Sequence, residues 1–262
     1  MCRLLAYLGP SILLDYLLYK PEHSLIVQSY QPREMTAGLL NADGFGIGWY
    51  HPQRETDPFT YKNILPIWND INLPQLSRYI ESGCVIANVR SATPGQAVDL
   101  NNCQPFRAGK ILGIHNGYIE NFRYSIYKKM RSLLNEKAYL LISGTTDSEH
   151  IFALVMHELL TNQKRSLAAA TRTALNILAD LAASHQIAAS ANLILTDGHH
   201  LIATRFAVDT AIPSLYWLRD DPTLPSAALI ASEPLFPGNW NRCPENSLIT
   251  VGENLEINIY PL

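Results

Sequence analysis

Cys2 is the residue whose position points to chemistry most directly. Its small side chain allows Met1 to be removed, and we expect that removal, which leaves a free α-amine beside the thiol. An unperturbed α-amine has a pKa of about 7.7–8.0 and a thiol one of about 8.5, so one residue can be both base and nucleophile near neutral pH. Most cysteines in second position have no such role, so this interpretation needs support from other residues.

Four further motifs follow Cys2 in a definite order. They are Asn41-Ala-Asp-Gly-Phe-Gly, Val89-Arg-Ser-Ala-Thr93, His115-Asn-Gly117 and Gly144-Thr-Thr-Asp-Ser-Glu149. Each motif taken singly has an ordinary interpretation that we would prefer. Arg90 could form a salt bridge at the rim of the molecule, Asn116-Gly117 is a common hairpin turn, and Asp147 is a plausible helix N-cap.

Taken together, with the cysteine in position 2, these motifs resemble the class II, N-terminal-cysteine glutamine amidotransferases of the Ntn-hydrolase superfamily. The resemblance runs from Cys2 through the helix expected after Asp147, which is over half the chain. If the ordinary interpretations were correct, three unrelated motifs would have to occur by chance in the same order as in that family. The resemblance implies a four-layer αββα sandwich, with two antiparallel sheets between helical layers.

The resemblance also implies roles in acyl transfer from a γ-glutamyl amide through a cysteinyl thioester. Cys2 would supply the thiolate, and the side-chain amide of Asn116 with the backbone N–H of Gly117 would form the oxyanion hole. Arg90 would hold the glutamyl α-carboxylate through a bidentate fork. Asp147 would pair with the α-ammonium and can cap the helix as well.

Other residues near these motifs are expected to support the site. Asp43 and Gly44 match the loop that faces the nucleophile in the family, and His115 is expected to orient its loop, because the α-amine already supplies a base. Neither a metal nor an organic cofactor is expected, because the cysteines form no CxxC pair and no metal-like spacing with histidine. The other three cysteines are expected to be structural thiols: Cys84, Cys103 and Cys243.

The elements that must position these residues are short strands and a few helices. Strands are predicted over residues 3–8, ended by Gly9-Pro10, and over 83–89 and 110–114, which become polar at Arg90 and His115. The period of the apolar residues predicts helices over 11–19, 147–160 and 167–185. Later strands are predicted over 192–196, 201–206, 215–218, 228–232, 247–251 and 255–260. Hairpins with helices grouped between them predict the α+β class and one continuous domain over 1–262.

The composition excludes several classes of protein. With 47% hydrophobic and 16% charged residues, the 262-residue chain is not intrinsically disordered. The chain has 20 Lys and Arg and 23 Asp and Glu, a net charge of −3. This balance argues against a protein that binds nucleic acid or anionic membranes. Apolar runs such as residues 151–156 are too short to span a bilayer, and the N-terminus shows no secretory signal. We therefore expect a cytoplasmic protein.

Finer features distinguish between members of the family. About seventy residues follow Ala191, too few for a synthase domain, so the chain is either a subunit that lends ammonia to a partner or a separate hydrolase. The segments 1–10, 21–28 and 231–235 look like the γ-glutamyl amidohydrolases of ergothioneine biosynthesis, and Pro94-Gly95 stands where the ammonia-channelling enzymes commonly carry His-Gly. We expect a small-molecule substrate, γ-glutamyl-hercynylcysteine sulfoxide, with water as acceptor. A glutaminase subunit for a partner synthase and a catalytically silent glutamyl-binding module stay open, as do the leaving amine and the oligomeric state.

Overall fold

The alternation of side chains along the central strands decides the architecture. In β1 (Arg3–Leu13), Leu5 and Tyr7 point to one face of the sheet, and Leu4 and Ala6 point to the other. All four are fully buried, so both faces of the strand need a covering layer. The same holds for β7 (Ala189–Thr196), in which every residue is buried. Strands of this kind can only lie in the middle layers of a sandwich.

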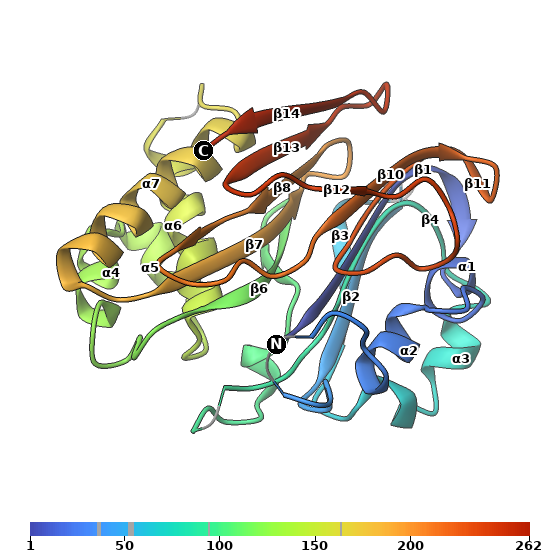
Figure 1. Ribbon diagram of the computed structural model, residues 1–262, viewed down its shortest axis with the longest axis horizontal. Helices are drawn as coiled ribbons and strands as arrows, with labels where there is room; N and C mark the ends of the chain where they lie inside the picture. Colours follow the sequence, from blue (N-terminus) through green and yellow to red (C-terminus); the bar gives the residue numbers. More distant parts are fainter. Residues whose placement is uncertain (36–37, 52–54, 94, 163) are drawn as a thin grey trace.

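The computed structural model describes residues 1–35, 38–51, 55–93, 95–162 and 164–262, and these form two antiparallel sheets packed face to face (Figure 1). The first sheet has the order β12-β10-β11-β1-β4-β2-β3, with β2 (Phe45–His51), β3 (Glu55–Asn63), β4 (Glu81–Val89), β10 (Tyr216–Asp221), β11 (Leu224–Ala231) and β12 (Asn241–Arg242). The second has the order β14-β13-β8-β7-β6-β5, with β5 (Phe106–Ala108), β6 (Ile111–Ile119), β8 (Leu201–Arg205), β13 (Ser247–Val251) and β14 (Ile257–Pro261), and β9 (Ala207–Val208) pairs with β7.

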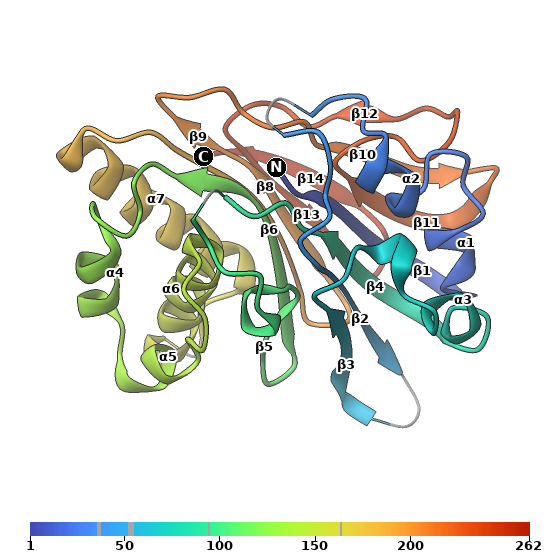
Figure 2. The same cartoon turned by 90° about the horizontal axis from the view of Figure 1, so that it is seen from below.

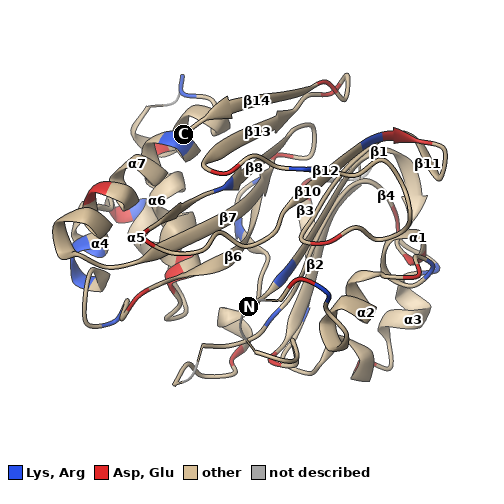
Figure 3. Cartoon of the chain, in the orientation of Figure 1, with Lys and Arg blue, Asp and Glu red and all other residues tan. Residues whose placement is uncertain are grey.

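Helices cover the outer face of each sheet (Figure 2). The first sheet carries short helices and one 3₁₀ turn: α1 (Asp15–Leu18), α2 (Leu25–Tyr30), η1 (Ile67–Asn69) and α3 (Leu73–Leu76). The second sheet carries α4 (Tyr127–Leu133), α5 (Glu136–Leu140), α6 (Asp147–Thr161) and α7 (Leu167–His185), and a second 3₁₀ turn, η2 (Leu100–Asn102), precedes β5. Lys and Arg are interspersed with Asp and Glu over the helices and loops (Figure 3).

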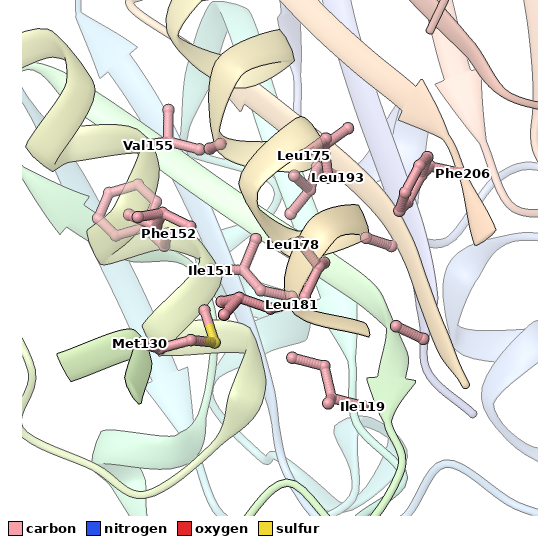
Figure 4. Close-up of a cluster of buried hydrophobic side chains, with 14 of the residues drawn as sticks. Ile119, Met130, Ile151, Phe152, Val155, Leu175, Leu178, Leu181, Leu193 and Phe206 are labelled. Carbon is pink, nitrogen blue, oxygen red and sulfur yellow. The ribbon is translucent and has the colours of Figure 1, made fainter. Parts of the chain in front are cut away.

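Three apolar clusters hold the four layers together. One lies between the sheets and includes Leu4, Ile86, Ile114 and Ile194. A second lies between the first sheet and its short helices. The third packs α6 and α7 against the second sheet, with side chains such as Ile151, Leu175 and Leu193 (Figure 4). The α+β class and the αββα layering are therefore confirmed. Within the described residues, no helix is both long and apolar enough to cross a membrane.

Two predicted boundaries at the start of the chain are wrong. The first strand does not end at Gly9-Pro10 but continues to Leu13, because a register irregularity between Leu8 and Ile12 lets β1 keep its pairing with β4 past the proline. The helix predicted over residues 11–19 consequently shrinks to α1 (Asp15–Leu18). In contrast, α7 has the bounds predicted from its apolar period, residues 167–185.

Candidate active site

Cys2 directly precedes β1, and the N-terminus lies between the two sheets (Figure 1). Its thiol is free and half-buried, whereas the thiols of Cys84, Cys103 and Cys243 are free and buried. The Cys2 Sγ atom lies 3.9 Å from the carbonyl oxygen of Ser91. The Cys2 carbonyl oxygen accepts a hydrogen bond of 2.8 Å from Nε of Arg3. Cys2 is thus the one accessible thiol of the four.

The start of the chain lies in an environment that favours the neutral form of the Met1 α-amine. In the chain as described this amine belongs to Met1, and burial lowers its pKa below the usual value. The positive charge of Arg3 acts in the same direction, while Cys2 and Asp43 act against it. A general base must be unprotonated, and burial of the start of the chain acts in that direction on the amine that is present, that of Met1.

The edge of β6 carries three backbone N–H groups that point away from β7. The N–H of His115 donates to Oε1 of Gln104, and the N–H of Ile119 donates to Oδ2 of Asp147 at 2.8 Å. Gly117 lies between these two, so by the alternation of an antiparallel strand its N–H points to the same edge. β5 pairs with β6 only as far as Gly113. The Gly117 N–H is therefore available to a ligand, about 6.7 Å along the strand from the N–H that Asp147 binds.

Asn116 and Gly117 do not form the hairpin turn that their types would allow, because both lie within β6, opposite Asn192 and Ala191. The Asn116 side chain is 1% exposed, and neither atom of its amide has a hydrogen-bond partner among the described residues. It lies on the inner face of the sheet, two residues after the core residue Ile114. A side chain added at Gly117 would place Cβ 2.0 Å from the carbonyl oxygen of Ser190, so only glycine fits.

Arg90 and Asp147 are two buried charges of opposite sign. The guanidinium of Arg90, 3% exposed, donates to neutral acceptors: the Asp43 and Ala97 carbonyl oxygens at 3.2 and 3.4 Å and Oε1 of Gln96 at 3.3 Å. Among the described residues, the Asp147 carboxylate, 6% exposed, accepts from the N–H of Ile119 and from the N–H and hydroxyl groups of Ser148, all of them neutral. Neither takes part in the ion pairs found among the described residues. Each could accept a charged partner from a ligand.

Asn102, which the sequence analysis missed, links the loops that carry these two charges. Its Nδ2 donates to the Ala97 carbonyl oxygen at 3.1 Å, the same oxygen that Arg90 contacts. Its Oδ1 accepts from the N–H of Thr145 at 3.0 Å, two residues before Asp147. No sequence pattern predicts a contact between loops more than forty residues apart in the chain, so the sequence held no signal for this role of Asn102.

The N-terminus of α6 differs from the prediction in its cap. Thr146, rather than Asp147, is the N-cap, and its Oγ1 accepts from the N–H of Glu149 at 3.2 Å. Because the cap is supplied by its neighbour, the Asp147 carboxylate is released from capping and reaches β6 instead.

His115 and Asp43 both brace the surroundings of the site. The His115 ring is buried, with Nδ1 2.8 Å from the Ser148 hydroxyl and Nε2 3.3 Å from the Ser190 carbonyl oxygen. Burial lowers its pKa, against the effect of Asp147, so the ring is neutral and holds β6 between α6 and β7. Asp43 accepts from the N–H of Ala92 at 2.8 Å, one residue beyond the Cys2–Ser91 contact.

Gly44 needs its glycine, because it has φ +109° and an added Cβ would lie 2.5 Å from Sγ of Cys103. Pro94, which we singled out in the sequence, lies outside the described residues. Within the described ranges, no group of three or more His, Cys, Asp or Glu side chains is placed to hold a metal ion.

Comparison with known proteins identifies relatives of the whole chain. The model of the class II glutamine amidotransferases matches residues 19–223, a range that contains Arg90, Asn116 and Asp147 and begins after Cys2. The chain is 29% identical to the probable glutamine amidotransferase DUG3 of Saccharomyces cerevisiae, over 96% of this chain and 82% of that protein. It is 28% identical to the gamma-glutamyl-hercynylcysteine sulfoxide hydrolase of Mycolicibacterium smegmatis, over 96% of both proteins.

Solved structures show the same fold. A glutamine aminotransferase class II domain protein from Silicibacter pomeroyi superposes with a TM-score of 0.72 at 23% identity, over 100% of this chain and 99% of that one. The glutamine phosphoribosylpyrophosphate amidotransferase of Bacillus subtilis gives 0.67 at 14% identity, over 99% of this chain and 49% of that one. Together with the family match, the relatives indicate an amidohydrolase enzyme.

Proposed function

Since this chain belongs to the class II glutamine amidotransferase family, we propose that it hydrolyses a γ-glutamyl amide bond through a thioester on Cys2 and releases glutamate. The observation that carries the proposal is the pair of unmatched buried charges, Arg90 and Asp147. A glutamyl group with a free amino acid end carries one carboxylate and one ammonium, which match these charges in number and sign. Leaving either buried charge without a partner would cost about 3–5 kcal/mol, so the charges select this end of a substrate.

The first half of the reaction forms the thioester. The Cys2 thiol passes its proton to the α-amine that removal of Met1 exposes, and the thiolate attacks the γ-carbonyl carbon. The carbonyl oxygen becomes an oxyanion, to which the Asn116 amide and the Gly117 N–H donate. When the C–N bond breaks, the leaving amine takes the proton from the α-amine.

The second half uses water as acceptor. The neutral α-amine takes a proton from a water molecule, whose oxygen adds to the thioester carbonyl carbon, and the oxyanion forms again at the same donors. The C–S bond then breaks, the thiolate recovers the proton, and glutamate leaves. Arg90 and Asp147 hold the same end of the glutamyl group in both halves, so they position the acyl group for two attacks.

For the leaving group we propose hercynylcysteine sulfoxide. Support comes from the Mycolicibacterium smegmatis relative, whose printed name gives this activity and which aligns with the chain over 96% of both lengths. A glutaminase subunit that supplies ammonia to a partner is the alternative. The strands after Ala191 complete both sheets of the sandwich, so residues 192–262 belong to the same fold in either case, and the choice between the two functions rests on the relative and on the assay below.

A panel of γ-glutamyl amides that includes free glutamine tests the proposal, with glutamate and ammonia measured separately. We expect glutamate release from γ-glutamyl-hercynylcysteine sulfoxide to exceed release from glutamine. Cys2→Ala and a form that retains Met1 should both be inactive, whereas the matched control Cys243→Ala, a buried thiol elsewhere, should keep its activity. Turnover of glutamine alone would favour the ammonia-supplying subunit, and binding of glutamate without any turnover would favour a silent module.

A further inference from the structure

Three segments to which the proposed reaction assigns no role meet at Arg3, the residue that follows Cys2. Arg3 comes from the start of the chain, His23 from the segment 21–28, and Glu233 from the segment 231–235. Nη1 of Arg3 lies 2.9 Å from Oε1 of Glu233, and Nε2 of His23 lies 2.7 Å from Oε2. All three side chains are at most 2% exposed. We call Arg3, His23 and Glu233 the rear network.

The rear network is joined to the nucleophile through Arg3. While Nη1 pairs with Glu233, Nε of the same guanidinium donates to the Cys2 carbonyl oxygen at 2.8 Å. The next residue is also fixed on this side, because the Leu4 N–H donates to Oγ of Ser232 and the Ser232 N–H donates to the Leu4 carbonyl oxygen, both at 2.9 Å. These contacts all involve atoms C-terminal to the Cys2 α-carbon, so they persist when Met1 is removed.

Glu233 also holds a second backbone segment, at Arg33 and Glu34. Its carboxylate accepts from the N–H groups of Arg33 at 2.8 Å and Glu34 at 3.0 Å. Gly38 lies near the loop that contacts Cys2, because a Cβ built there would be 3.5 Å from Oγ of Ser91. Burial alone would favour the neutral acid, but hydrogen bonds from His23, Arg33 and Glu34 and the charge of Arg3 hold the pKa of Glu233 at about 2.

Stability alone explains such an arrangement poorly. A buried ion pair is often no more stabilising than apolar side chains of the same volume, because both charges lose their hydration. Here the pair lies at the N-terminal end of β1, where the next residues, Leu4, Leu5 and Ala6, are all apolar and fully buried. The pair instead fixes a rigid planar guanidinium, whose Nη1 donates to Glu233 and whose Nε donates to the Cys2 carbonyl oxygen.

We propose that Glu233, acting through Arg3, is a positioning residue that holds Cys2 in the orientation required for attack. The inference rests on the proposed function, since it assigns the orientation of Cys2 to acyl transfer. Glu233 itself contacts neither substrate nor thiol in this arrangement. Its effect passes through one guanidinium, so Arg3 and Glu233 should act as a unit in catalysis.

Two single variants, their combination and one matched control test this proposal. Glu233→Gln removes the charge that orients Arg3. Arg3→Lys keeps a positive charge for Glu233 but lacks the second arm that reaches the Cys2 carbonyl oxygen. The matched control is Asp70→Asn, because Asp70 is also a buried carboxylate that accepts four hydrogen bonds, from Tyr61, Asn63, Asn72 and Leu73, away from Cys2.

We expect kcat to fall by about 10²-fold in Glu233→Gln and in Arg3→Lys with KM little changed, as for a displaced reacting group. The double variant should lose no more than Arg3→Lys alone, because the two residues act in series. Asp70→Asn should keep the wild-type kcat even if its melting temperature falls. A wild-type kcat in Arg3→Lys, or additive losses in the double variant, would overturn the proposal. If Glu233→Gln fails to fold, Arg3→Lys alone decides.

A measurement without substrate separates this inference from the proposed function. Iodoacetamide reports on Cys2, because the other three cysteines are buried. We expect its alkylation rate to differ from wild type in both rear-network variants and to equal wild type in Asp70→Asn, because the rear network contacts the backbone of Cys2 and so sets the position and accessibility of its thiol. Altered alkylation with an inactive wild type would refute only the proposed function. Unaltered alkylation with an active wild type and normal kcat in the variants would refute only the positioning role.

Discussion

Replacement of Asn116 by leucine should raise the stability of the protein while it removes most of the activity. The Asn116 amide is buried without a hydrogen-bond partner in the described structure, and such a group costs about 1–3 kcal/mol. Leucine has the same branched shape and no polar atoms. We therefore expect the free energy of unfolding of Asn116→Leu to rise by about 1–3 kcal/mol, which for a chain of this size raises the melting temperature by about 2–4 °C per kcal/mol.

The activity should move in the opposite direction. Loss of one oxyanion donor lowers kcat by about 10²–10³-fold, and KM should change little because the donor acts in the transition state. Thermal unfolding followed by circular dichroism gives the stability, and glutamate release at saturating substrate gives kcat. The opposite signs of the two effects are the specific expectation, because a merely structural asparagine would lose both.

Asn192→Leu is the matched control on the neighbouring strand. Asn192 lies directly opposite Asn116 and is equally buried, but its Nδ2 donates to the carbonyl oxygens of Pro213 and Ser214 at 3.0 and 3.2 Å. The same substitution there removes the side-chain donor to the Ser214 carbonyl oxygen and one of the two donors to the Pro213 carbonyl oxygen, which Nε of Arg205 also contacts, so it should destabilise the protein. If Asn116→Leu also lowered the melting temperature, or kept the wild-type kcat, the assignment of its amide as an oxyanion donor would be refuted.

Four further outcomes are expected. Asp147→Asn should lower kcat/KM about 10²–10³-fold and by a similar factor on every γ-glutamyl amide, because it removes the charge for the α-ammonium; a loss that depends on the leaving amine would assign Asp147 to a wall of the site. Gly117→Ala should fold poorly or not at all, since its Cβ would meet the Ser190 carbonyl oxygen; a well-folded, active variant by circular dichroism would contradict the strand geometry. The pKa of Glu233, held at about 2 against a usual 4.5, implies that its ionised form stabilises the fold above about pH 4.5 and that this contribution is lost as the pH falls toward 2. The difference in unfolding free energy between wild type and Glu233→Gln should therefore shrink by about 3 kcal/mol from pH 6 to pH 2, and a constant difference would contradict the pKa. Treatment with a chelator should leave glutamate release unchanged, and its loss would reveal a metal requirement.

The sequence allowed prediction of those features that are encoded locally. The apolar period of residues 167–185 yields α7 with its observed bounds, because the helix has one buried stripe and an N-cap at Ser166. Of the five residues that the resemblance named, Cys2 directly precedes β1, Arg90 directly follows β4, Asp147 begins α6, and Asn116 and Gly117 lie within β6. Their catalytic roles stay predictions until the variants above are measured.

The features that escaped prediction depend on tertiary contacts. Asn116-Gly117 has the composition of a turn, and only the pairing of β6 with β7 keeps it extended. The contact between Arg3 and Glu233 joins residues 230 positions apart, so no window of sequence contains it. The same is true of Asn102, whose amide joins two loops. Polar bridges of this kind have no periodicity, because a single side chain makes each one.

The most direct test of the central claim is the mass of the enzyme during turnover. Wild-type protein mixed with a γ-glutamyl amide and quenched in acid should carry one glutamyl group, and peptide mapping should place it on an N-terminal peptide that begins with Cys2. Cys2→Ala should carry none. A glutamyl group on another residue, or glutamate release by Cys2→Ala at the wild-type rate, would contradict the thioester mechanism.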